Sequence, residues 1–144
     1  MEIRKLKNKE IEEALKLVWE VFIEFEAPEY CREGVEEFKN FLNDKAEISH
    51  LCLYGVLEEQ RIIGILAMRD CHISLFFVKK EYHRKGIGKA LFKYMKNDTG
   101  KCRFTVNSSP YAIRIYEKLG FMPKDIEQVT NGIRYTPMIY GNFK

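Results

Sequence analysis

The sequence lacks the residue patterns of a metal site and of a membrane span. Its four cysteines are far apart, no two of them form a C-x-x-C pair, and the three histidines have no ligand spacing relative to them. No apolar run approaches the ~20 residues that a membrane helix needs, and the first thirteen residues, MEIRKLKNKEIEE, contain no apolar signal region. These absences predict a cytoplasmic protein with free thiols, no metal and no membrane partner.

Strong charge of one sign is also missing. The chain has 24 Lys and Arg against 21 Asp and Glu, which gives a net charge of +3, and its pI is about 8.6. A nucleic-acid-binding domain would show a basic stripe with exposed aromatic residues, whereas this mild charge suits a small anionic ligand. Nucleic-acid binding through the basic residues of segment 84–93 stays an alternative, and strong salt dependence would be needed to support it. The length of 144 residues suits one domain, spanning 1–144.

One stretch, residues 73–95, carries most of the chemical information. Six β-forming residues lead through a charged loop to Gly86 and Gly88, and an apolar stripe of helical period follows. The first turn of a helix exposes backbone N–H groups and carries about half a positive charge, and glycines let an anion approach those groups. Three basic residues add full positive charge: Arg84, Lys85 and Lys89. The stretch therefore predicts a phosphate or pyrophosphate site.

The order of predicted elements indicates a mixed α/β fold. The predicted strands are 2–6, 51–57, 62–68, 73–78, 102–106, 122–129 and 133–140. Four helices are predicted: one after Asn8, one that includes residues 35–42, one after Gly86 and one after Ser109. Breaks are expected at 97–100 and at the Asn131-Gly132 turn, and Pro137 favours an edge or a bulge. A right-handed crossover makes strands 73–78 and 102–106 parallel. The result is a mostly antiparallel mixed sheet with helices on both faces.

Segment 73–95 closely resembles motif A of the GNAT superfamily of acyl-CoA N-acetyltransferases, which has [QR]-x-x-G-x-[GA] after a β-strand. The match includes Gly86, Gly88 and Leu91, while His83 stands where the family usually has Gln or Arg. The patterns of a P-loop and of a dinucleotide fingerprint are not met. Segment 107–121, NSSPYAIRIYEKLGF, resembles the family's motif B. The element order is also that of the GNAT fold, so the resemblance covers nearly the full chain.

The resemblance implies acetyl-CoA as the acyl donor and a splayed pair of central parallel strands. The loop amides would bind the pyrophosphate, the end of the strand would pair with the pantetheine amides, and Asn107 would contact the pantetheine arm. Asn107 is alternatively a turn or helix-cap residue. The cofactor-binding residues predicted in this way are Phe76, Phe77, Val78, Arg84, Lys85, Gly86, Ile87, Gly88, Lys89 and Asn107.

Acetyl transfer from a thioester to an amine needs a neutral amine and a proton for the departing thiolate. Reference pKa values are about 10.4 for a lysine-like amine and about 8.5 for a thiol, so a base and an acid both help. By resemblance Tyr116 is the general acid; alternatively it is a core tyrosine. Because segment 62–78 contains no glutamate, His72 or Ser74 is predicted to hold a water chain that removes the amine proton. His72 is alternatively a structural strand residue.

The resemblance thus predicts an acetyl-CoA-dependent N-acetyltransferase that acts by direct transfer on a primary amine of a small molecule or peptide. The alternative is a non-catalytic domain that binds an acyl-CoA and reports on it or docks a partner. The acceptor pocket is expected from the first two helices, the following loop and the C-terminal hairpin. Glu24 and Glu26, together with Glu29, favour a cationic amine, although they can equally be a solvated helix end. A homodimer is left open.

Overall fold

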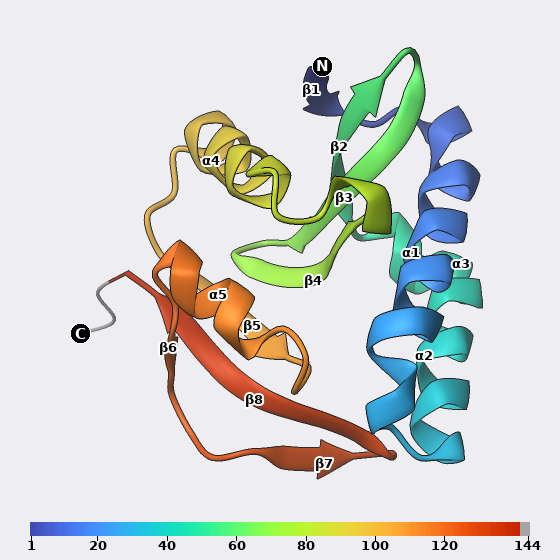
Figure 1. The fold of residues 1–144 in the computed structure, drawn as a ribbon, viewed down its shortest axis with the longest axis vertical. Coiled ribbons are helices and arrows are strands. Elements are labelled where there is room, and N and C mark those ends of the chain that lie inside the picture. Colours follow the sequence, from blue (N-terminus) through green and yellow to red (C-terminus); the bar gives the residue numbers. More distant parts are fainter. Residues whose placement is uncertain (142–144) are drawn as a thin grey trace.

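A mixed β-sheet with helices on both faces organises the chain (Figure 1). The computed structural model describes residues 1–141. The strands are β1 (Glu2–Lys5), β2 (Cys52–Glu58), β3 (Arg61–Arg69), β4 (His72–Val78), β5 (Phe104–Ser108), β6 (Met122–Pro123), β7 (Gln128–Thr130) and β8 (Ile133–Tyr140). The helices are α1 (Ile11–Phe25), α2 (Arg32–Asn43), α3 (Lys45–Ser49), α4 (Ile87–Thr99) and α5 (Ile113–Leu119).

The sheet has the order β1-β2-β3-β4-β5-β8-β6, and β7 pairs with β8 outside this path. Strands β1 to β4 form antiparallel neighbours, which confirms the predicted meander. Along β4, burial alternates: Ile73, Leu75 and Phe77 are buried, while the residues between them are half-buried. This alternation places the half-buried residues of β4, His72 and Ser74 among them, on one face of the strand.

The central parallel pairing of the sheet is short. The parallel strands β4 and β5 pair only at His72 with Thr105 and at Ile73 with Val106, after which the two strands part. The Thr105 N–H donates to the Cys71 carbonyl at 3.0 Å. The His72 Nδ1 lies 2.8 Å from the Thr105 hydroxyl, which adds a side-chain bond at the same point. The predicted splay of the central parallel pair is confirmed, and it opens the sheet between β4 and β5.

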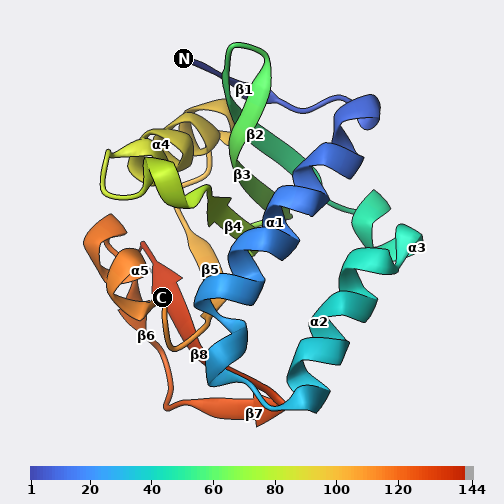
Figure 2. The ribbon, with the colours of Figure 1, turned by 45° about the vertical axis from the view of Figure 1, so that its right-hand side comes forward.

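Helices α4 and α5 lie on one face of the sheet and α1 and α2 on the other (Figure 2), and a hydrophobic core is packed on each face. Helix α4 contributes Leu91 and Met95 to one core, which α5 joins through Tyr116. Helices α1 and α2 contribute Val18, Phe22 and Leu42 to the other core. These helices form because their apolar residues recur at helical spacing and can be buried against the sheet. Within residues 1–141, no helix combines the length and the apolar character that crossing a bilayer requires.

Several predicted boundaries were wrong because tertiary contacts outweigh local signals. Helix α4 continues through the expected break to Thr99, since Asp98 accepts a hydrogen bond from the Tyr54 hydroxyl at 2.6 Å. Gly100, with a φ of 68°, then ends the helix. Strand β5 begins at Phe104 and ends at Ser108, two residues later than expected at each end. The short helix α3 was not foreseen, although Asp44 caps it through two backbone N–H groups.

The C-terminal third shows three further differences. The Ser109 hydroxyl accepts from the Ala112 N–H at 3.3 Å within a turn, so α5 begins only at Ile113. The strand expected at 122–129 is divided into β6 and β7, while the Asn131-Gly132 turn after β7 is confirmed. Pro137 lies within β8 between two neighbours, not at an edge. The Pro137 carbonyl accepts a hydrogen bond from the Lys124 N–H, just after β6. The N–H that proline lacks would lie on this same side of the strand, where the short strand β6 ends, so no ladder hydrogen bond is lost to β5.

Candidate active site

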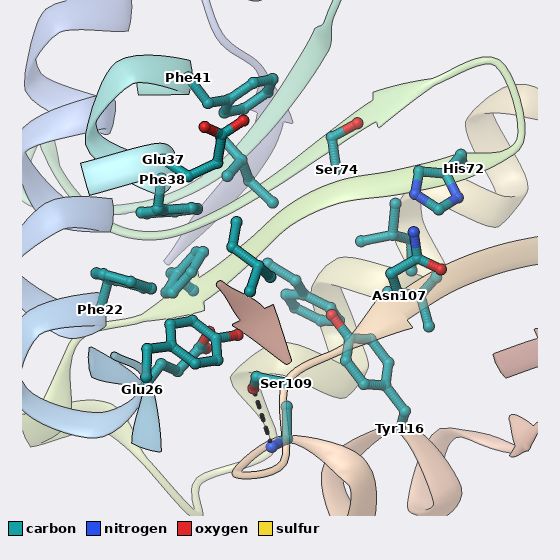
Figure 3. Close-up of a pocket in the computed structure, with 18 residues that line it drawn as sticks. Phe22, Glu26, Glu37, Phe38, Phe41, His72, Ser74, Asn107, Ser109 and Tyr116 are labelled. Atoms are coloured by element: carbon teal, nitrogen blue, oxygen red, sulfur yellow. Dashed lines mark hydrogen bonds between the residues drawn. The ribbon is translucent and has the colours of Figure 1, made fainter. Parts of the chain in front are cut away.

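A cavity of about 320 Å³ lies where β4 and β5 part (Figure 3). Its lining residues come from α1, α2 and the segment between them, from β4, β5 and β8, and from α5 and the turn that precedes it. The cavity therefore touches both helix layers through the opened sheet. Seven residues singled out from the sequence are brought together here: Glu26, His72, Ser74, Phe76, Phe77, Asn107 and Tyr116.

Tyr116 enters the cavity from α5. The helix packs this side chain inward because Tyr116 lies one turn after Ala112, which also lines the cavity. The ring packs edge-on against Phe76, with the ring centroids 6.0 Å apart. Burial, and to a smaller degree the charge of Glu26, raises the pKa of the Tyr116 hydroxyl above its ordinary value. The phenol therefore keeps its proton at neutral pH and can donate it.

Glu26 enters the cavity from the end of α1. It is the C-terminal cap residue of this helix and precedes the short 3₁₀ turn Ala27–Glu29, so the chain direction changes there. Burial raises the pKa of the Glu26 carboxyl to about 7, against a lowering by the hydrogen bond from the Ser109 hydroxyl, and the charge of Glu29 adds to the increase. A carboxyl group that titrates near neutral pH can both accept and release a proton under working conditions.

His72, Ser74 and Asn107 form a polar row along the parting strands (Figure 3). Burial lowers the pKa of His72, so its imidazole is neutral at pH 7. Its Nδ1 is engaged with the Thr105 hydroxyl. Asn107 is exposed and lies beyond the last paired residues of β4 and β5, in the region where β5 no longer contacts β4. The neighbouring backbone of both strands is therefore open to a ligand that enters between them.

The basic loop before α4 has the geometry of an anion site. Arg84 and Gly86 both adopt left-handed backbone angles, with φ of 62° and 77°. The first N–H to bond within α4 is that of Ala90, to the Gly86 carbonyl at 3.0 Å, so the N–H groups of the first turn point out of the helix. An added Cβ on Gly86 would meet no atom within 4 Å, which shows open space beside the loop. This end of α4 suits a phosphate or pyrophosphate group.

Phe76 links the anion site to the cavity. A Cβ placed on Gly88 would lie 3.5 Å from the tip of the Phe76 ring, and the same ring packs against Tyr116. His83, at the first position of motif A, lies 2.6 Å from the Val78 carbonyl through Nε2 and packs on Phe25 at 4.9 Å. The imidazole therefore holds the charged loop against the end of β4. Contacts thus lead from Gly88 in the first turn of α4 through Phe76 to Tyr116 in the cavity, and this line of residues is called the anion path below.

The remaining predicted residues lie outside the cavity. The Val78 side chain packs beside the core that includes α4, and Ile87 is buried in that core, so only the backbone of Ile87 faces the loop. Lys85 lies over the ring of Tyr82, 5.6 Å from its centroid, while Lys89 is exposed on α4. Glu24 pairs with Lys80 at 3.3 Å and lines a separate hollow. No cluster of three or more His, Cys, Asp or Glu in the described 141 residues is arranged to hold a metal.

The sequence analysis missed several residues of the cavity. Phe22 and Phe38 read as ordinary core residues, and Ser109 read as a helix cap. Glu37 was also overlooked, although a signal existed: in α2 it lies four residues before Phe41, and residues four apart share one helix face. Glu37 brings a second carboxylate to the cavity.

A family model for the acetyltransferase (GNAT) domain matches residues 26–141. The chain belongs to the GNAT acetyltransferase family. Three solved structures share the fold of this GNAT chain. They are a GCN5-related N-acetyltransferase from Rhodopseudomonas palustris (18% identity, 98% of this chain and 95% of that chain, TM-score 0.82), the PaiA N-acetyltransferase from Thermoplasma acidophilum in complex with coenzyme A (19%, 98% and 98%, 0.76), and YjaB from Escherichia coli (17%, 98% and 98%, 0.75). Among curated proteins, none matches the sequence significantly.

Membership in the GNAT family agrees with what the residues of the site offer. Coenzyme A has a pyrophosphate, an extended arm with two amides and a terminal sulfur. The open first turn of α4 fits the pyrophosphate, and the unpaired backbone between β4 and β5 fits the arm. The cavity at the end of this path contains a proton donor, Tyr116, and a group that titrates near pH 7, Glu26. Tyr116 can therefore donate a proton in this cavity, and Glu26 can accept one.

Proposed function

We propose that this GNAT domain transfers the acetyl group of acetyl-CoA directly to a primary amine of a small molecule or peptide. The single observation that carries the proposal is that Glu26 and Tyr116 line one cavity, at the point where the anion path from α4 meets the parted strands. Acetyl-CoA supplies a thioester, whose carbon–sulfur bond breaks as the bond from the amine nitrogen to the carbonyl carbon forms. The chain must supply orientation, one proton acceptor and one proton donor.

Glu26 is the proposed proton acceptor. An acceptor amine with a pKa of about 10.4 arrives as an ammonium ion at neutral pH, and only the neutral form can attack. Burial raises the pKa of Glu26 to about 7, which makes the carboxylate a stronger base than an exposed glutamate. The water chain proposed along His72 and Ser74 is the other route for this proton. His72 has only Nε2 free for that role, because Nδ1 contacts Thr105.

Tyr116 is the proposed proton donor for the thiolate. Its raised pKa means that it stays protonated while Glu26 is ionised, so the pair provides the acid and the base in one pH range. The Phe76 ring packs against Tyr116 and lies near Gly88 at the phosphate end of the path. The Asn107 side chain, at the open end of β5, is proposed to contact the pantetheine arm.

A screen for amine-dependent release of CoA tests the proposal. The protein is incubated with acetyl-CoA and a panel of amines, amino acids, aminoglycosides and peptides, and free thiol is followed with a chromogenic disulfide. Tyr116→Phe is compared with Tyr94→Phe, a matched control because Tyr94 lies at the surface of α4 and does not line the cavity. The proposal requires at least one acceptor, and a loss of rate in Tyr116→Phe alone. Calorimetric binding of CoA without turnover of any amine would instead support an acyl-CoA-binding domain.

A further inference from the structure

The cavity contains two carboxylates, and no lysine or arginine is among the described residues that line it. We propose that the acceptor is a small molecule with two cationic amino groups separated by a short apolar spacer. In this arrangement Glu26 receives the amine that is acetylated, and Glu37 binds the second ammonium group. This inference rests on the proposed transferase function and specifies the substrate class of that same site.

The charge of the cavity is the first argument. Two basic side chains close in sequence to the cavity walls are engaged outside the cavity: Lys80 pairs with Glu24 at 3.3 Å, and Arg134 pairs with Glu127 at 3.2 Å. Arg134 also donates to the Glu29 carbonyl at 3.1 Å. Two carboxylates that line a cavity without lysine or arginine among its described residues favour a cationic ligand. A ligand with two positive charges satisfies both groups, whereas a ligand with one positive charge leaves Glu37 without a counterion.

The walls of the cavity are the second argument. Five aromatic residues line the side formed by α1, α2 and β4: Phe22, Tyr30, Phe38, Phe41 and Phe77. Phe22 and Phe38 stack with their ring centroids 4.0 Å apart. Figure 3 shows these two rings between Glu37 at one end and Glu26 at the other. Such walls favour methylene groups by apolar contact and ammonium groups by cation–π attraction. An apolar spacer with a cation at each end matches this order.

The position of Glu37 is fixed by the fold, which is the third argument. The Asn131 side-chain amide donates to Glu37 Oε1 at 3.4 Å, from the turn between β7 and β8. The start of α2 is pressed against that same turn, since a Cβ on Gly34 would lie 2.2 Å from the Gly132 carbonyl oxygen. Glu37 therefore has a fixed place at the cavity, and the cavity volume of about 320 Å³ limits the acceptor to a small molecule.

A series of amines with one chain length tests the inference. The probes are 1,4-diaminobutane, butylamine and 4-aminobutanol, assayed with acetyl-CoA for thiol release. Wild-type protein should show at least tenfold higher kcat/KM for the diamine than for either monoamine. Glu37→Gln should reduce this preference to within threefold, because the kcat/KM of the diamine falls much more than that of butylamine. Glu36→Gln is the matched control, because it removes the same charge from an exposed neighbour on α2 outside the cavity.

Binding to the CoA-saturated protein separates the inference from the proposed function, since it needs no turnover. Titration calorimetry should show diamine binding that is weakened at least tenfold by Glu37→Gln and not by Glu36→Gln, with circular dichroism confirming that both variants fold. Equal kcat/KM for diamine and monoamines in the wild type would overturn the dication assignment while the transferase stands. Glu37-dependent diamine binding without acetylation would uphold the dication site and overturn the transferase. Absence of both binding and preference would overturn the inference.

Discussion

Glu26 and Tyr116 line one cavity from two different helices, and their pKa values are displaced so that both groups are in the useful protonation state at neutral pH. Burial raises the pKa of Glu26 to about 7. Burial and the Glu26 charge raise the pKa of Tyr116 above its ordinary value of about 10. From about pH 7 to pH 10 the carboxylate is therefore ionised while the phenol retains its proton. This relationship leads to the predictions below.

Replacing Tyr116 by Phe should lower kcat at least tenfold and leave the affinity for CoA within a few-fold of wild type. The substitution removes one oxygen from a buried ring whose packing against Phe76 and Phe121 is kept, so the fold is retained. General acid catalysis typically contributes about a hundred- to ten-thousand-fold in rate. Steady-state kinetics and calorimetry provide the two measurements. If kcat is unchanged across the pH range, Tyr116 is a core tyrosine and water protonates the thiolate.

The kcat/KM for the amine should increase as the pH is raised to about 7 and then stay constant from about pH 7 to pH 10. Below pH 7 protonation of Glu26 removes the base, so the rate falls as pH falls through the Glu26 pKa of about 7. Above pH 7 the ionised Glu26 takes the proton from the bound ammonium, so the amine pKa of about 10.4 sets only the upper end of the plateau.

Glu26→Gln supplies the contrasting profile. Without the carboxylate, only the small fraction of free neutral amine can react, so kcat/KM should increase continuously with pH up to the amine pKa of about 10.4. The variant should also lose at least tenfold in rate at pH 7.5, because positioned general bases contribute about a hundred-fold or more. A flat region that persists in Glu26→Gln would show that another group accepts the proton.

His72→Gln should lower kcat less than Glu26→Gln does. Burial lowers the pKa of His72, which makes it a weaker base than an ordinary histidine, and Nδ1 already contacts the Thr105 hydroxyl. Glutamine keeps a neutral polar group able to contact Thr105. Rates of both variants at pH 7.5 decide the order. A larger loss in His72→Gln would move the base to the water chain along His72 and Ser74.

Gly88→Val should reduce the affinity for CoA at least tenfold, and Gly88→Ala should reduce it much less. An alanine Cβ would lie at ordinary contact distance, 3.5 Å from the Phe76 ring, so the fold accepts it. The two further methyl groups of valine must extend either into that ring or over the N–H groups of the first turn of α4. Covering those groups leaves the diphosphate without its hydrogen bonds. Calorimetry with CoA measures the difference, and equal affinities for both variants would place the diphosphate elsewhere.

Glu24→Gln should leave the KM of the acceptor within twofold, while Glu26→Gln raises it. Only Glu26 lines the cavity; Glu24 pairs with Lys80 at the surface. An exposed ion pair of this kind is worth little to stability, so the folded state should tolerate its loss. Acceptor titrations at fixed acetyl-CoA compare the two. A larger effect of Glu24→Gln would indicate that the acceptor enters over the hollow beside Lys80.

The fold was predictable because its signals are local. Strands β2, β3 and β4 follow runs of β-forming residues, and Gly86 and Gly120 mark a helix start and a helix end. The mistakes occurred where a distant contact overrides the local sequence. The polar residues before Gly100 remain helical because Asp98 bonds to Tyr54, which is far away in the sequence. The local sequence of the segment before Gly100 contains no pattern that would predict this distant contact.

The donor side of the site was predictable to a greater extent than the acceptor side. Gly86, Gly88 and Tyr116 lie in motifs whose spacing itself places them at a helix start or on a helix face. Glu37 becomes part of the site only because α2 packs beside the turn at Gly132, almost a hundred residues later in the chain. The aromatic residues around it have the helical spacing of any buried face. Their role depends on the parting of β4 and β5, which leaves a cavity instead of filled core.

The parted strands also have a consequence for amide hydrogen exchange. Beyond Ile73, the backbone groups of β4 that face away from β3 have no partner on β5, while those that face β3 are paired in the meander. Without ligand, every second amide along residues 74–78 should therefore exchange rapidly, next to slowly exchanging neighbours. A bound extended chain would pair with these amides and slow their exchange. The sheet of this protein thus leaves a position for a strand that the polypeptide itself does not supply.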